Sequence, residues 1–470
     1  MKKTKIICTL GPSSESEAII TKMVKSGMNV ARMNFSHGEH SEHLDRINIV
    51  RNVSKKLGVP VAVLLDTKGP EYRIGTFKNR AIFLNDGDDF IFTSKKVEGN
   101  QERVSVSYSG IVKQLEPGDI ILVNDGLVKF KVVSKNDTEL FCKVVIGGKL
   151  TDRKSMCFPD KVFKQTFLSK QDKEDLLFGI KHDVDFVACS FVSTASDIKS
   201  VRAFLDANGG EKIQLIAKIE NRSGVDNAEE ILKYCEGLMV ARGDLGTELP
   251  YTELPEIQKK LIALCKLKGG ISIVATEMLE SMSEKPRPTR AEISDVANAV
   301  YDGASAIMLS GESAAGKYPV ESVSAMAKIA VETEKNIHYS NRFENSEYVF
   351  SNLADSLSHS ACQLAINTNA ACIVASTTSG QTARMVSRFR VGVPILGLTP
   401  DEKAYRQLAL SWNVYPMIVR RSASTDDLFK IAKETAKREG FIKKGQTIVI
   451  TGGMTHRKGQ TSLIHADILD

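Results

Sequence analysis

The sequence predicts an α/β protein built around a (β/α)8 barrel, the TIM barrel architecture. Two observations support this fold class. Short apolar runs, each followed by a loop and a helical pattern, occur three times before residue 69 and five times after residue 166. Polar residues gather where these runs end, and in (β/α)8 barrels the active site lies at the carboxyl ends of the strands.

The eight apolar runs are the expected barrel strands, and we assign residues 1–68 and 167–340 to the barrel. The first three runs are "KIICTL", "NVARMNF" and "VAVLLDT", and the later five are "VDFVACSFV", "IQLIAKIE", "GLMVARGD", "ISIVATEM" and "SAIMLSGE". Their expected last residues are Leu10, Phe35, Thr67, Val192, Glu220, Asp244, Met278 and Glu312. The polar residues at or near these ends are Asn34, Asp66, Ser190, Glu220, Asp244, Thr276 and Glu312.

Two further segments interrupt or follow the barrel. Residues 69–166 read as an all-β insertion, because alternating strands and hairpin signals such as "LNDGDDF" replace the βα rhythm. Residues 341–470 read as a separate α/β unit with apolar strands at "ACIVAS", "VPILGL", "NVYPMIV" and "QTIVIT". Between them, Thr289 and Glu292 fit a capping box at the start of a helix.

Composition excludes several classes of protein. The chain of 470 residues is 42% hydrophobic and 26% charged with a net charge of +6, which argues against a dedicated nucleic-acid binder. No run of about 18 apolar residues predicts a membrane span, and the first residues read as a strand rather than as a signal peptide. The eight cysteines include no C-x-x-C pair, so we expect reduced, buried thiols and a cytoplasmic protein.

The stretch "LIAKIENRSG" places Lys218 and Glu220 on one face of an apolar strand. Two buried charges are tolerated only if they are paired or bind something. Glu220 and Asp244 would close neighbouring strands, and two carboxylates with open positions suit Mg²⁺ or Mn²⁺. The alternative is that these carboxylates cap helices or pair with Arg222 or Arg242.

Three other motifs carry chemical information. Backbone N–H groups in "ARGDLG" could hold an anion, although a tight turn explains the glycines equally well. Arg32 at a strand end suits a phosphate, unless it pairs with Asp66 or Asp244. His37 follows in a loop and receives no catalytic role. "GESAAGKY" lacks the Ser or Thr of a P-loop, because Tyr318 stands there.

Several strings, in order and covering nearly the whole chain, resemble the pyruvate kinase family. They are "CTLGPSS", "MNVARMNFSHG", "LLDTKGPEYRIG", "AKIEN", "MVARGDLG", "ATEMLESM", "PTRAEISDVANAVYDGASAIMLSGESAAGKYPVE" and "TTSGQTARMVSRFR". The resemblance implies transfer of the phosphoryl group of phosphoenolpyruvate to ADP, giving pyruvate and ATP in the last step of glycolysis. It also implies a barrel A domain, a mobile β-barrel B domain that acts as a lid, and a C-terminal regulatory domain.

The resemblance also implies roles for individual residues. Glu220 and Asp244 would bind Mg²⁺ or Mn²⁺, Lys218 would contact the phosphoryl group and the enolate oxygen, and Arg32 would hold the same phosphoryl group. The substrate carboxylate would lie against Ala241, Gly243, Asp244 and Thr276, and Thr276 would lie near the face where the enolate is protonated. The residues expected near the nucleotide are Arg73, Lys154, Asn34 and His37.

A potassium site is implied as well. Its ligands would be Asn34, Ser36, Asp66 and the Thr67 carbonyl. Glu71 stands in the string "KGPE", where family members that need K⁺ carry glutamate, so we expect K⁺ dependence. Two departures concern the site: Glu277 follows Thr276 where the family usually has glutamine, and "KSMCFPD" replaces the usual "KGVNLPG".

The C-terminal unit resembles the part of the family that binds allosteric effectors. The implied phosphate-binding residues are Thr377, Thr378, Ser379, Gly380, Thr382 and Arg457, with Lys458 beside the last. We expect a sugar-phosphate or nucleotide effector, with an effector-free structural domain as the alternative. The family implies a homotetramer, and the chain is expected to lack the additional C-terminal domain of some bacterial members.

Two other functions compete with this interpretation. A metal-dependent aldolase acting on pyruvate-like substrates would share the barrel and the metal pair, but not the inserted domain or the two arginines. A catalytically silent paralogue would bind effectors only, and the presence of Lys218, Glu220, Asp244, Arg32 and Arg73 argues against it.

Overall fold

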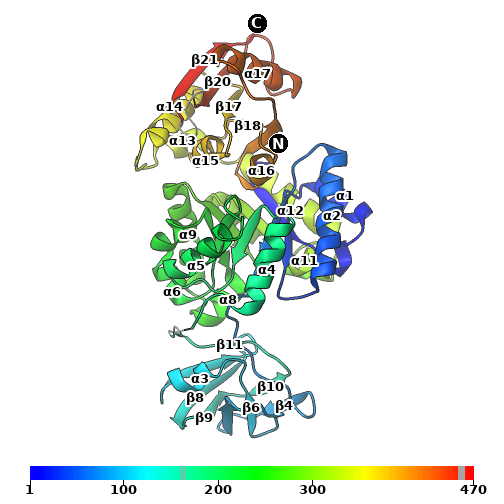
Figure 1. Ribbon diagram of the computed structural model, residues 1–470, viewed down its shortest axis with the longest axis vertical. Coiled ribbons are helices and arrows are strands. Elements are labelled where there is room, and N and C mark those ends of the chain that lie inside the picture. The colour runs from blue at the N-terminus through cyan, green and yellow to red at the C-terminus, as the bar shows by residue number, and fades with distance from the viewer. Residues whose placement is uncertain (160, 162, 164, 454–460) are drawn as a thin grey trace.

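Eight parallel strands close into a barrel at the centre of the molecule (Figure 1). The structure is a computed structural model, and it describes residues 1–159, 161, 163, 165–453 and 461–470. The strands are β1 (Lys5–Thr9), β2 (Val30–Asn34), β3 (Ala62–Asp66), β12 (Phe186–Cys189), β13 (Gln214–Ile219), β14 (Gly237–Ala241), β15 (Ile271–Ala275) and β16 (Ala306–Leu309). Their order around the barrel is β1-β16-β15-β14-β13-β12-β3-β2, which confirms the predicted fold class.

Each strand ends one to three residues earlier than the sequence suggested, and this changes the setting of two acidic residues. β14 ends at Ala241, so Asp244 lies in the first turn of α8 (Arg242–Glu248) rather than on the strand. Glu312 likewise lies in α11 (Gly311–Ala314). An acidic side chain in the first turn of a helix interacts favourably with the positive end of the helix dipole, so a helix can begin where a strand seemed to continue.

Helices surround the barrel and bury its outer surface. They are α1 (Glu17–Ser26), α2 (His40–Leu57), α4 (Lys170–Lys181), α5 (Ala195–Asp206), α6 (Arg222–Asp226), α7 (Ala228–Leu232), α9 (Leu254–Lys268), α10 (Arg290–Asp302) and α12 (Pro319–Lys335). The predicted capping box begins α10, where Thr289 Oγ1 accepts the N–H of Glu292 and the Glu292 carboxylate accepts the N–H of Thr289.

The side chains of each strand alternate between two cores. In β13, Leu215, Ala217 and Ile219 pack against the helices, whereas Ile216 packs inside the barrel. Ala409 and Leu410 from the C-terminal unit complete the inner core at the amino ends of the strands. The next inward positions after Ile216 are Lys218 and then Glu220, so the alternation carries two charges to the mouth of the barrel.

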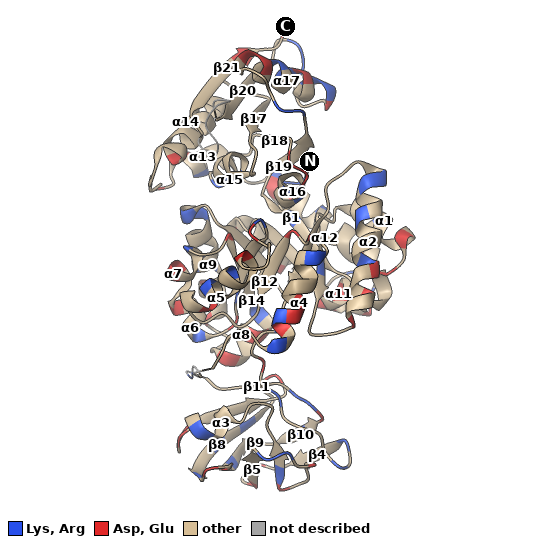
Figure 2. Ribbon diagram, viewed as in Figure 1, with Lys and Arg blue, Asp and Glu red and all other residues tan. Residues whose placement is uncertain are grey.

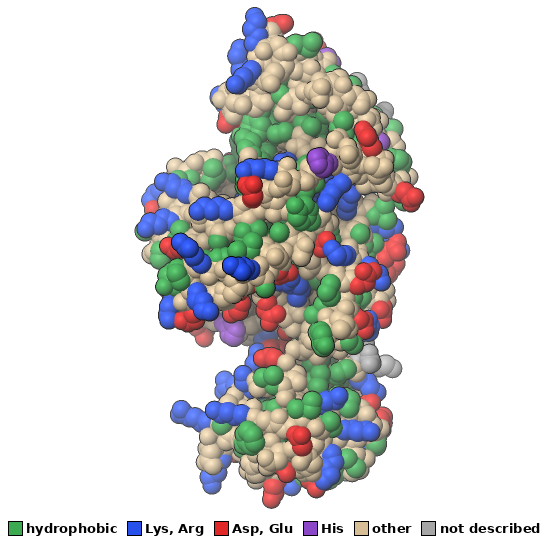
Figure 3. Space-filling model, turned by 180° about the vertical axis from the view of Figure 1, so that it is seen from behind, with side chains coloured by type: hydrophobic (Ala, Val, Ile, Leu, Met, Phe, Trp, Pro, Cys, Tyr) green, Lys and Arg blue, Asp and Glu red, His purple; other side chains and the backbone are tan. Residues whose placement is uncertain are grey.

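The insertion leaves the barrel after β3 and returns before α4. Its strands are β4 (Ala81–Leu84), β5 (Asp89–Thr93), β6 (Arg103–Ser105), β7 (Ile120–Val123), β8 (Val128–Lys135), β9 (Glu139–Ile146), β10 (Gly148–Thr151) and β11 (Met156–Cys157), with α3 (Gly110–Gln114). They form a six-stranded sheet of order β11-β7-β8-β9-β5-β6 and the pair β10-β4 around a core that includes Phe90, Phe92 and Phe130. A space-filling view shows a waist between this unit and the barrel (Figure 3).

The C-terminal unit lies at the other end of the barrel (Figure 1). Its helices are α13 (Tyr339–Glu344), α14 (Leu353–Asn367), α15 (Gln381–Ser387), α16 (Glu402–Gln407) and α17 (Thr425–Arg438). Its strands are β17 (Cys372–Ser376), β18 (Ile395–Thr399), β19 (Val414–Ile418), β20 (Thr447–Gly452) and β21 (Leu463–Ile468), in the order β19-β18-β17-β20-β21. β21 pairs antiparallel with β20 and was not predicted.

The structure also bears on two exclusions made from sequence. In the described part of the chain, no helix is long and apolar enough to cross a bilayer. The P-loop-like string "GESAAGKY" has a structural role instead, because the buried Glu312 carboxylate accepts the N–H groups of Leu279 and Ser310 at 3.0 and 2.7 Å. All eight cysteines are free thiols, and six of them are buried, whereas Cys157 and Cys235 are half-buried.

Candidate active site

Lys218 sits at the mouth of the barrel with three polar partners. Its Nζ lies 2.6 Å from Ser190 Oγ, 3.0 Å from Asp66 Oδ1 and 3.0 Å from Glu220 Oε1. Burial alone would lower the pKa of Lys218, but Asp66 and Glu220 outweigh it and raise the pKa above its usual value. The side chain is therefore a fixed positive charge, although only 11% of it is exposed.

Asp66 is the buried carboxylate that links two cations. Its Oδ2 lies 2.6 Å from Arg32 Nε, and its Oδ1 accepts from Lys218. Arg32 also donates from Nη1 to Thr9 Oγ1 at 2.8 Å. Burial would raise the pKa of Asp66, yet Arg32 and Lys218 hold it below the usual value. The expected alternative for Arg32, a pair with Asp66, is thus present, and it directs the guanidinium to the same site as Lys218.

Glu220 and Asp244 line one cavity of about 330 Å³ between the barrel and the insertion. Glu220 is 2% exposed and Asp244 is exposed. Burial raises the pKa of Glu220 to about 7, Lys218 opposes this rise, and the nearby Asp244 adds to it. Arg222 pairs with Glu253 and Arg242 pairs with Asp295, at 2.7 and 2.8 Å. The two carboxylates therefore share the cavity, and charged residues of both signs surround this end of the barrel near α4 and α8 (Figure 2).

The chemistry of this carboxylate pair fits a divalent cation. Glu220 Oε2 accepts the Phe191 N–H at 2.6 Å and Oε1 contacts Lys218, and each carboxylate oxygen keeps a further lone pair. Among the residues that the structure describes, no group of three or more His, Cys, Asp or Glu side chains is arranged around a metal position. Two carboxylates suit Mg²⁺ or Mn²⁺, which keeps waters and substrate oxygens as its remaining ligands.

Thr276 lies in a strained turn that contacts the first turn of α8. Its φ of 69° and the φ of 53° at Glu277 are both in the left-handed region, where a β-branched residue is rare. The Thr276 hydroxyl accepts the Gly243 N–H at 2.7 Å and donates to the Ala275 carbonyl at 2.6 Å. Arg242 Nη2 donates to the Thr276 carbonyl at 2.6 Å. Such strain is kept at functional sites more often than elsewhere.

The expected potassium ligands lie at the ends of two adjacent strands. Asn34 and Asp66 are register partners in β2 and β3. Asn34 Oδ1 accepts the Ser36 N–H at 3.2 Å, and the Thr67 carbonyl accepts the Ser190 hydroxyl at 2.6 Å. These are all oxygen donors, which is the ligand type that hard cations prefer. The donor set is compatible with K⁺.

The expected nucleotide residues are spread more widely. Arg73 pairs with Glu71 at 2.5 Å and donates to the Arg153 carbonyl at 2.7 Å, so it belongs to the base of the insertion. Lys154 lies on the returning connection, where its carbonyl accepts the Ile74 N–H at 3.0 Å. His37 is exposed beyond β2, and its carbonyl contacts His43 Nε2 at 2.9 Å. Only Asn34 of this set lies with the barrel-mouth residues.

The expected effector residues follow β17. Thr378 and Ser379 are exposed, Thr377 is buried, and Gly380 has a φ of 82° immediately before α15. Thr382 is buried and its hydroxyl lies 3.0 Å from Thr461 Oγ1. Arg457 and Lys458 lie outside the described residues, so the structure does not place them.

Sequence reasoning missed three residues that organise this site. Ser190 was recognised as polar at a strand end but received no role, and Phe191 and Thr9 were not singled out. Ser190 contacts Lys218, Phe191 contacts Glu220, and Thr9 contacts Arg32. A serine directly after the buried strand "VDFVAC" was the available signal for the first. Phe191 acts through its backbone N–H, and Thr9 contacts a residue on the neighbouring strand. No local sequence pattern indicates either contact.

Comparisons with known proteins agree along nearly the whole chain. Residues 1–323 match the family described as "Pyruvate kinase, barrel domain", and residues 355–466 match "Pyruvate kinase, alpha/beta domain". A curated pyruvate kinase from Clostridium acetobutylicum is 42% identical over 473 residues, covering 100% of both chains. Those from Sporosarcina psychrophila and Geobacillus stearothermophilus are 42% and 43% identical, covering 100% of this chain and 81% and 80% of their own length.

Proposed function

Because this chain belongs to the pyruvate kinase family and is therefore a phosphotransferase, we propose that it transfers the phosphoryl group of phosphoenolpyruvate to ADP. The observation that carries the proposal is the cluster at the barrel mouth. Lys218, Arg32 and Asp66 form a linked set of buried charges. Glu220 joins this set to the cavity that Asp244 also lines.

In the proposed reaction, the protein positions the phosphoryl group and stabilises its charge. Lys218 and Arg32 contact the two oxygens of the same carboxylate, Asp66, so both cations would be near enough to bind one anionic group. Phosphoryl transfer is catalysed chiefly by positioning and electrostatic stabilisation, which preorganised cations supply. Lys218 would also stabilise negative charge on the enolate oxygen as the phosphorus–oxygen bond breaks.

The substrate carboxylate would be held by the first turn of α8 and by Thr276. N–H groups at the start of a helix are free of helical partners, and Ala241, Gly243 and Asp244 lie at this start. The Gly243 N–H currently donates to Thr276 Oγ1, so binding would exchange one oxygen partner for another. Thr276 would then lie beside the carbon that accepts a proton to give pyruvate.

Two metal ions complete the proposal. A divalent cation held by Glu220 and Asp244 would neutralise charge on the phosphoryl oxygens. K⁺ would be held by Asn34, Ser36, Asp66 and the Thr67 carbonyl. Arg73 and Lys154, at the base of the insertion, would contact the nucleotide phosphates.

The potassium requirement is a testable part of this proposal. Glu71 supports it, because a glutamate at this position brings no positive charge that could replace K⁺. Its carboxylate pairs with Arg73. We expect activity to fall at least tenfold when K⁺ is replaced by tetramethylammonium at constant ionic strength, because a bulky organic cation cannot enter a cage of protein oxygens. Equal initial rates in the two salts would contradict the requirement.

A coupled assay tests the reaction itself. Phosphoenolpyruvate, ADP, Mg²⁺ and K⁺ are supplied, and lactate dehydrogenase reports pyruvate through loss of NADH absorbance. Turnover that requires ADP supports the proposal and excludes the aldolase and the silent paralogue. No turnover under these conditions would defeat it.

We also propose that the turn after β17 binds a sugar phosphate or a nucleotide. The exposed hydroxyls of Thr378 and Ser379 beside Gly380 support this, since such turns offer donors to phosphate. A sigmoidal dependence on phosphoenolpyruvate that becomes hyperbolic with an effector would support the proposal, and curves unchanged by every compound tried would remove it. The homotetramer and the cytoplasmic location stay predictions from the sequence.

A further inference from the structure

We propose that the turn formed by Ser190 and Phe191 positions Lys218 of β13 and Glu220 directly after it, and that Ser190 is a positioning residue for phosphoryl transfer. The turn directly follows β12, the barrel neighbour of β13. The predicted effect of this turn on kcat rests on the proposed function. Its effect on cation binding by Glu220 can be measured without that function.

Ser190 orients Lys218 through a hydroxyl that accepts from the lysine and donates to a nearby oxygen. The hydroxyl lies 2.6 Å from Lys218 Nζ, from which it accepts, and its possible acceptors are the Thr67 carbonyl at 2.6 Å and Asp66 Oδ1 at 3.2 Å. A serine hydroxyl has one hydrogen, so donation to either oxygen leaves its lone pairs for the lysine. Ser190 is 2% exposed, so water does not replace either contact.

Phe191 fixes Glu220 from the same turn. Its N–H donates to Glu220 Oε2 at 2.6 Å. The backbone of Phe191 has a φ of 58°, a left-handed conformation that is costly for a bulky residue and must be held by its surroundings. One short turn therefore aims the lysine with a side chain and the glutamate with a backbone amide.

The turn is supported by the first connection to the insertion. A Cβ at Gly69 would lie 2.7 Å from the Ser190 carbonyl oxygen and 2.9 Å from Ser190 Cβ, so only glycine fits. The Gly69 N–H donates to Asp172 Oδ1 at 3.0 Å, and Asp172 forms the capping box of α4 with Ser169. Gly69 thus packs directly against the turn that holds Lys218 and Glu220, and it is itself held by the first turn of α4.

The first pair of variants tests Ser190. We expect Ser190→Ala to lower kcat about tenfold or more, because small errors in the placement of a reacting group are costly. The KM for phosphoenolpyruvate should change less than about threefold, because Lys218 keeps Asp66 and Glu220 as partners. Ser190→Thr keeps the hydroxyl and should restore most of the lost kcat.

The second pair tests the support by Gly69, with a control of matched backbone conformation. Gly69 and Gly58 both have a φ of 66°, but a Cβ at Gly58, at the end of α2, meets no atom within 4 Å. Ala at either position brings the same backbone strain, and only Gly69→Ala displaces the turn. We expect Gly69→Ala to weaken Mn²⁺ binding, measured by electron paramagnetic resonance of free Mn²⁺, about fivefold or more. Gly58→Ala should leave Mn²⁺ affinity and kcat unchanged.

The outcomes separate this inference from the proposed function. If the wild-type chain turns over but Ser190→Ala keeps its kcat, or Ser190→Thr fails to restore it in a folded protein, the role of Ser190 is wrong. If the wild-type chain does not turn over phosphoenolpyruvate, the proposed function fails, and the Mn²⁺ comparison alone decides the role of the turn. Equal Mn²⁺ affinities of Gly69→Ala and Gly58→Ala would then overturn it.

Discussion

At the scale of single residues, buried charges at the mouth of the barrel are satisfied by one another and by neighbouring polar groups. Lys218 has two carboxylates and one hydroxyl around its ammonium group. Asp66 has Arg32 as a second cation, and Glu220 has a backbone N–H. Buried ions are costly unless they are paired and hydrogen-bonded, and each of these four groups meets that condition.

Replacing Lys218 should separate catalysis from folding. We expect Lys218→Met to lower kcat by at least about a thousandfold, because the preorganised cation beside the travelling phosphoryl group is lost. Folding and Mn²⁺ binding should persist largely intact, since Asp66 keeps Arg32 and Glu220 keeps the Phe191 N–H.

The control for this variant is Lys170→Met, because the Lys170 side chain is 94% exposed. Steady-state kinetics, circular dichroism and Mn²⁺ titration check the three quantities. A Lys218→Met protein that retains more than a tenth of the wild-type kcat would contradict the role of this lysine.

Glu277 gives a second prediction at this scale. It follows Thr276 and is exposed, so its repulsion of an anionic substrate is screened by water and salt. We expect Glu277→Gln to lower the KM for phosphoenolpyruvate by no more than about threefold at low ionic strength, with the difference vanishing at high salt. Glu211→Gln, an exposed change at the opposite end of the barrel, is the control. A KM that rises would show that Glu277 helps substrate binding.

At the scale of elements, short helices and strained turns decide where each site residue points. Asp244 belongs to the first turn of α8 rather than to β14, and Thr276 lies in a left-handed turn after β15. The apolar runs predicted all eight strands, since each run is long enough to be read locally. The early starts of α8 and α11 were not predicted, because a first turn of four residues carries too little periodicity to detect.

The capping box of α10 provides a test at this scale. Thr289→Ala removes the hydroxyl that accepts the Glu292 N–H, and such losses cost about 1 kcal/mol. We expect amide hydrogens in α10 to exchange about fivefold faster, a change that hydrogen-exchange mass spectrometry resolves. Thr252→Ala, at an exposed threonine before α9, should leave the exchange of α10 unchanged. Unchanged protection in Thr289→Ala would mean that tertiary packing alone holds this helix end.

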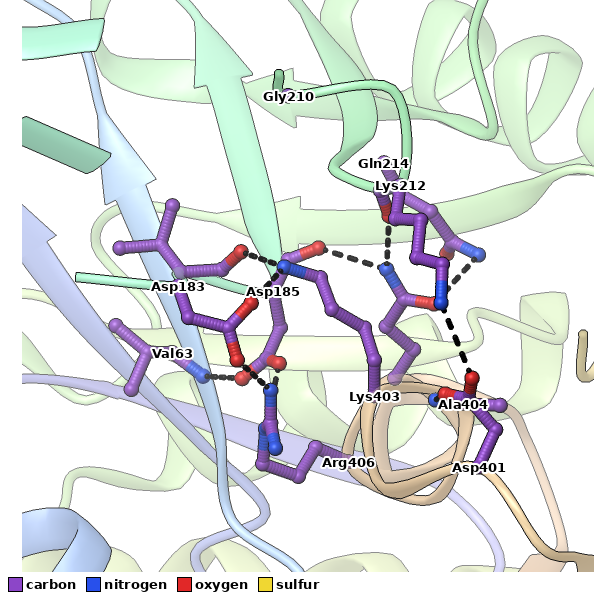
Figure 4. Close-up of polar contacts among 12 residues, drawn as sticks. Val63, Asp183, Asp185, Gly210, Lys212, Gln214, Asp401, Lys403, Ala404 and Arg406 are labelled. Atoms are coloured by element: carbon purple, nitrogen blue, oxygen red, sulfur yellow. Dashed lines mark hydrogen bonds and ion pairs between the residues drawn. The ribbon is translucent and has the colours of Figure 1, made fainter. Parts of the chain in front are cut away.

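At the scale of the whole molecule, a polar network joins the C-terminal unit to the amino ends of the barrel strands (Figure 4). Arg406 of α16 lies 2.8 Å from Asp185 Oδ1 and 2.5 Å from Asp183 Oδ2, and Lys403 contacts Asp183 at 2.6 Å. Asp185 is fully buried and also accepts from Arg51 and from the Val63 N–H. The limits of the units at residues 69–166 and 341–470 stay predictions that limited proteolysis would test.

Removing Arg406 should loosen this junction. We expect Arg406→Ala to lower the first thermal transition by roughly 2 to 6 °C in calorimetry, because Asp185 loses one of its two charged partners and keeps Arg51 and the Val63 N–H. Arg420→Ala is the matched control, since Arg420 pairs with Asp427 inside the C-terminal unit. Identical transitions in the wild type and Arg406→Ala would show that apolar contacts alone hold the units together.

The same junction should respond to acid. Partial burial would raise the pKa of Asp183, but Lys403 and Arg406 outweigh it and hold that pKa below its usual range. A carboxylate with a lowered folded-state pKa stabilises the fold above its unfolded pKa, and this contribution is lost as the pH falls through the folded value. The difference between the wild type and Arg406→Ala should therefore shrink below about pH 4.

The sequence by itself determined the fold class, the family and the two charges at the end of β13, because strand alternation and strings of neighbouring residues are local properties. Only the tertiary structure decided the partners of those charges. Lys218 meets Asp66 across 152 residues and Ser190 across 28, and the register of parallel strands sets both contacts. Parallel strands are joined by long crossovers. Residues that meet at the barrel mouth are therefore far apart in the sequence, and no fixed spacing predicts their contact.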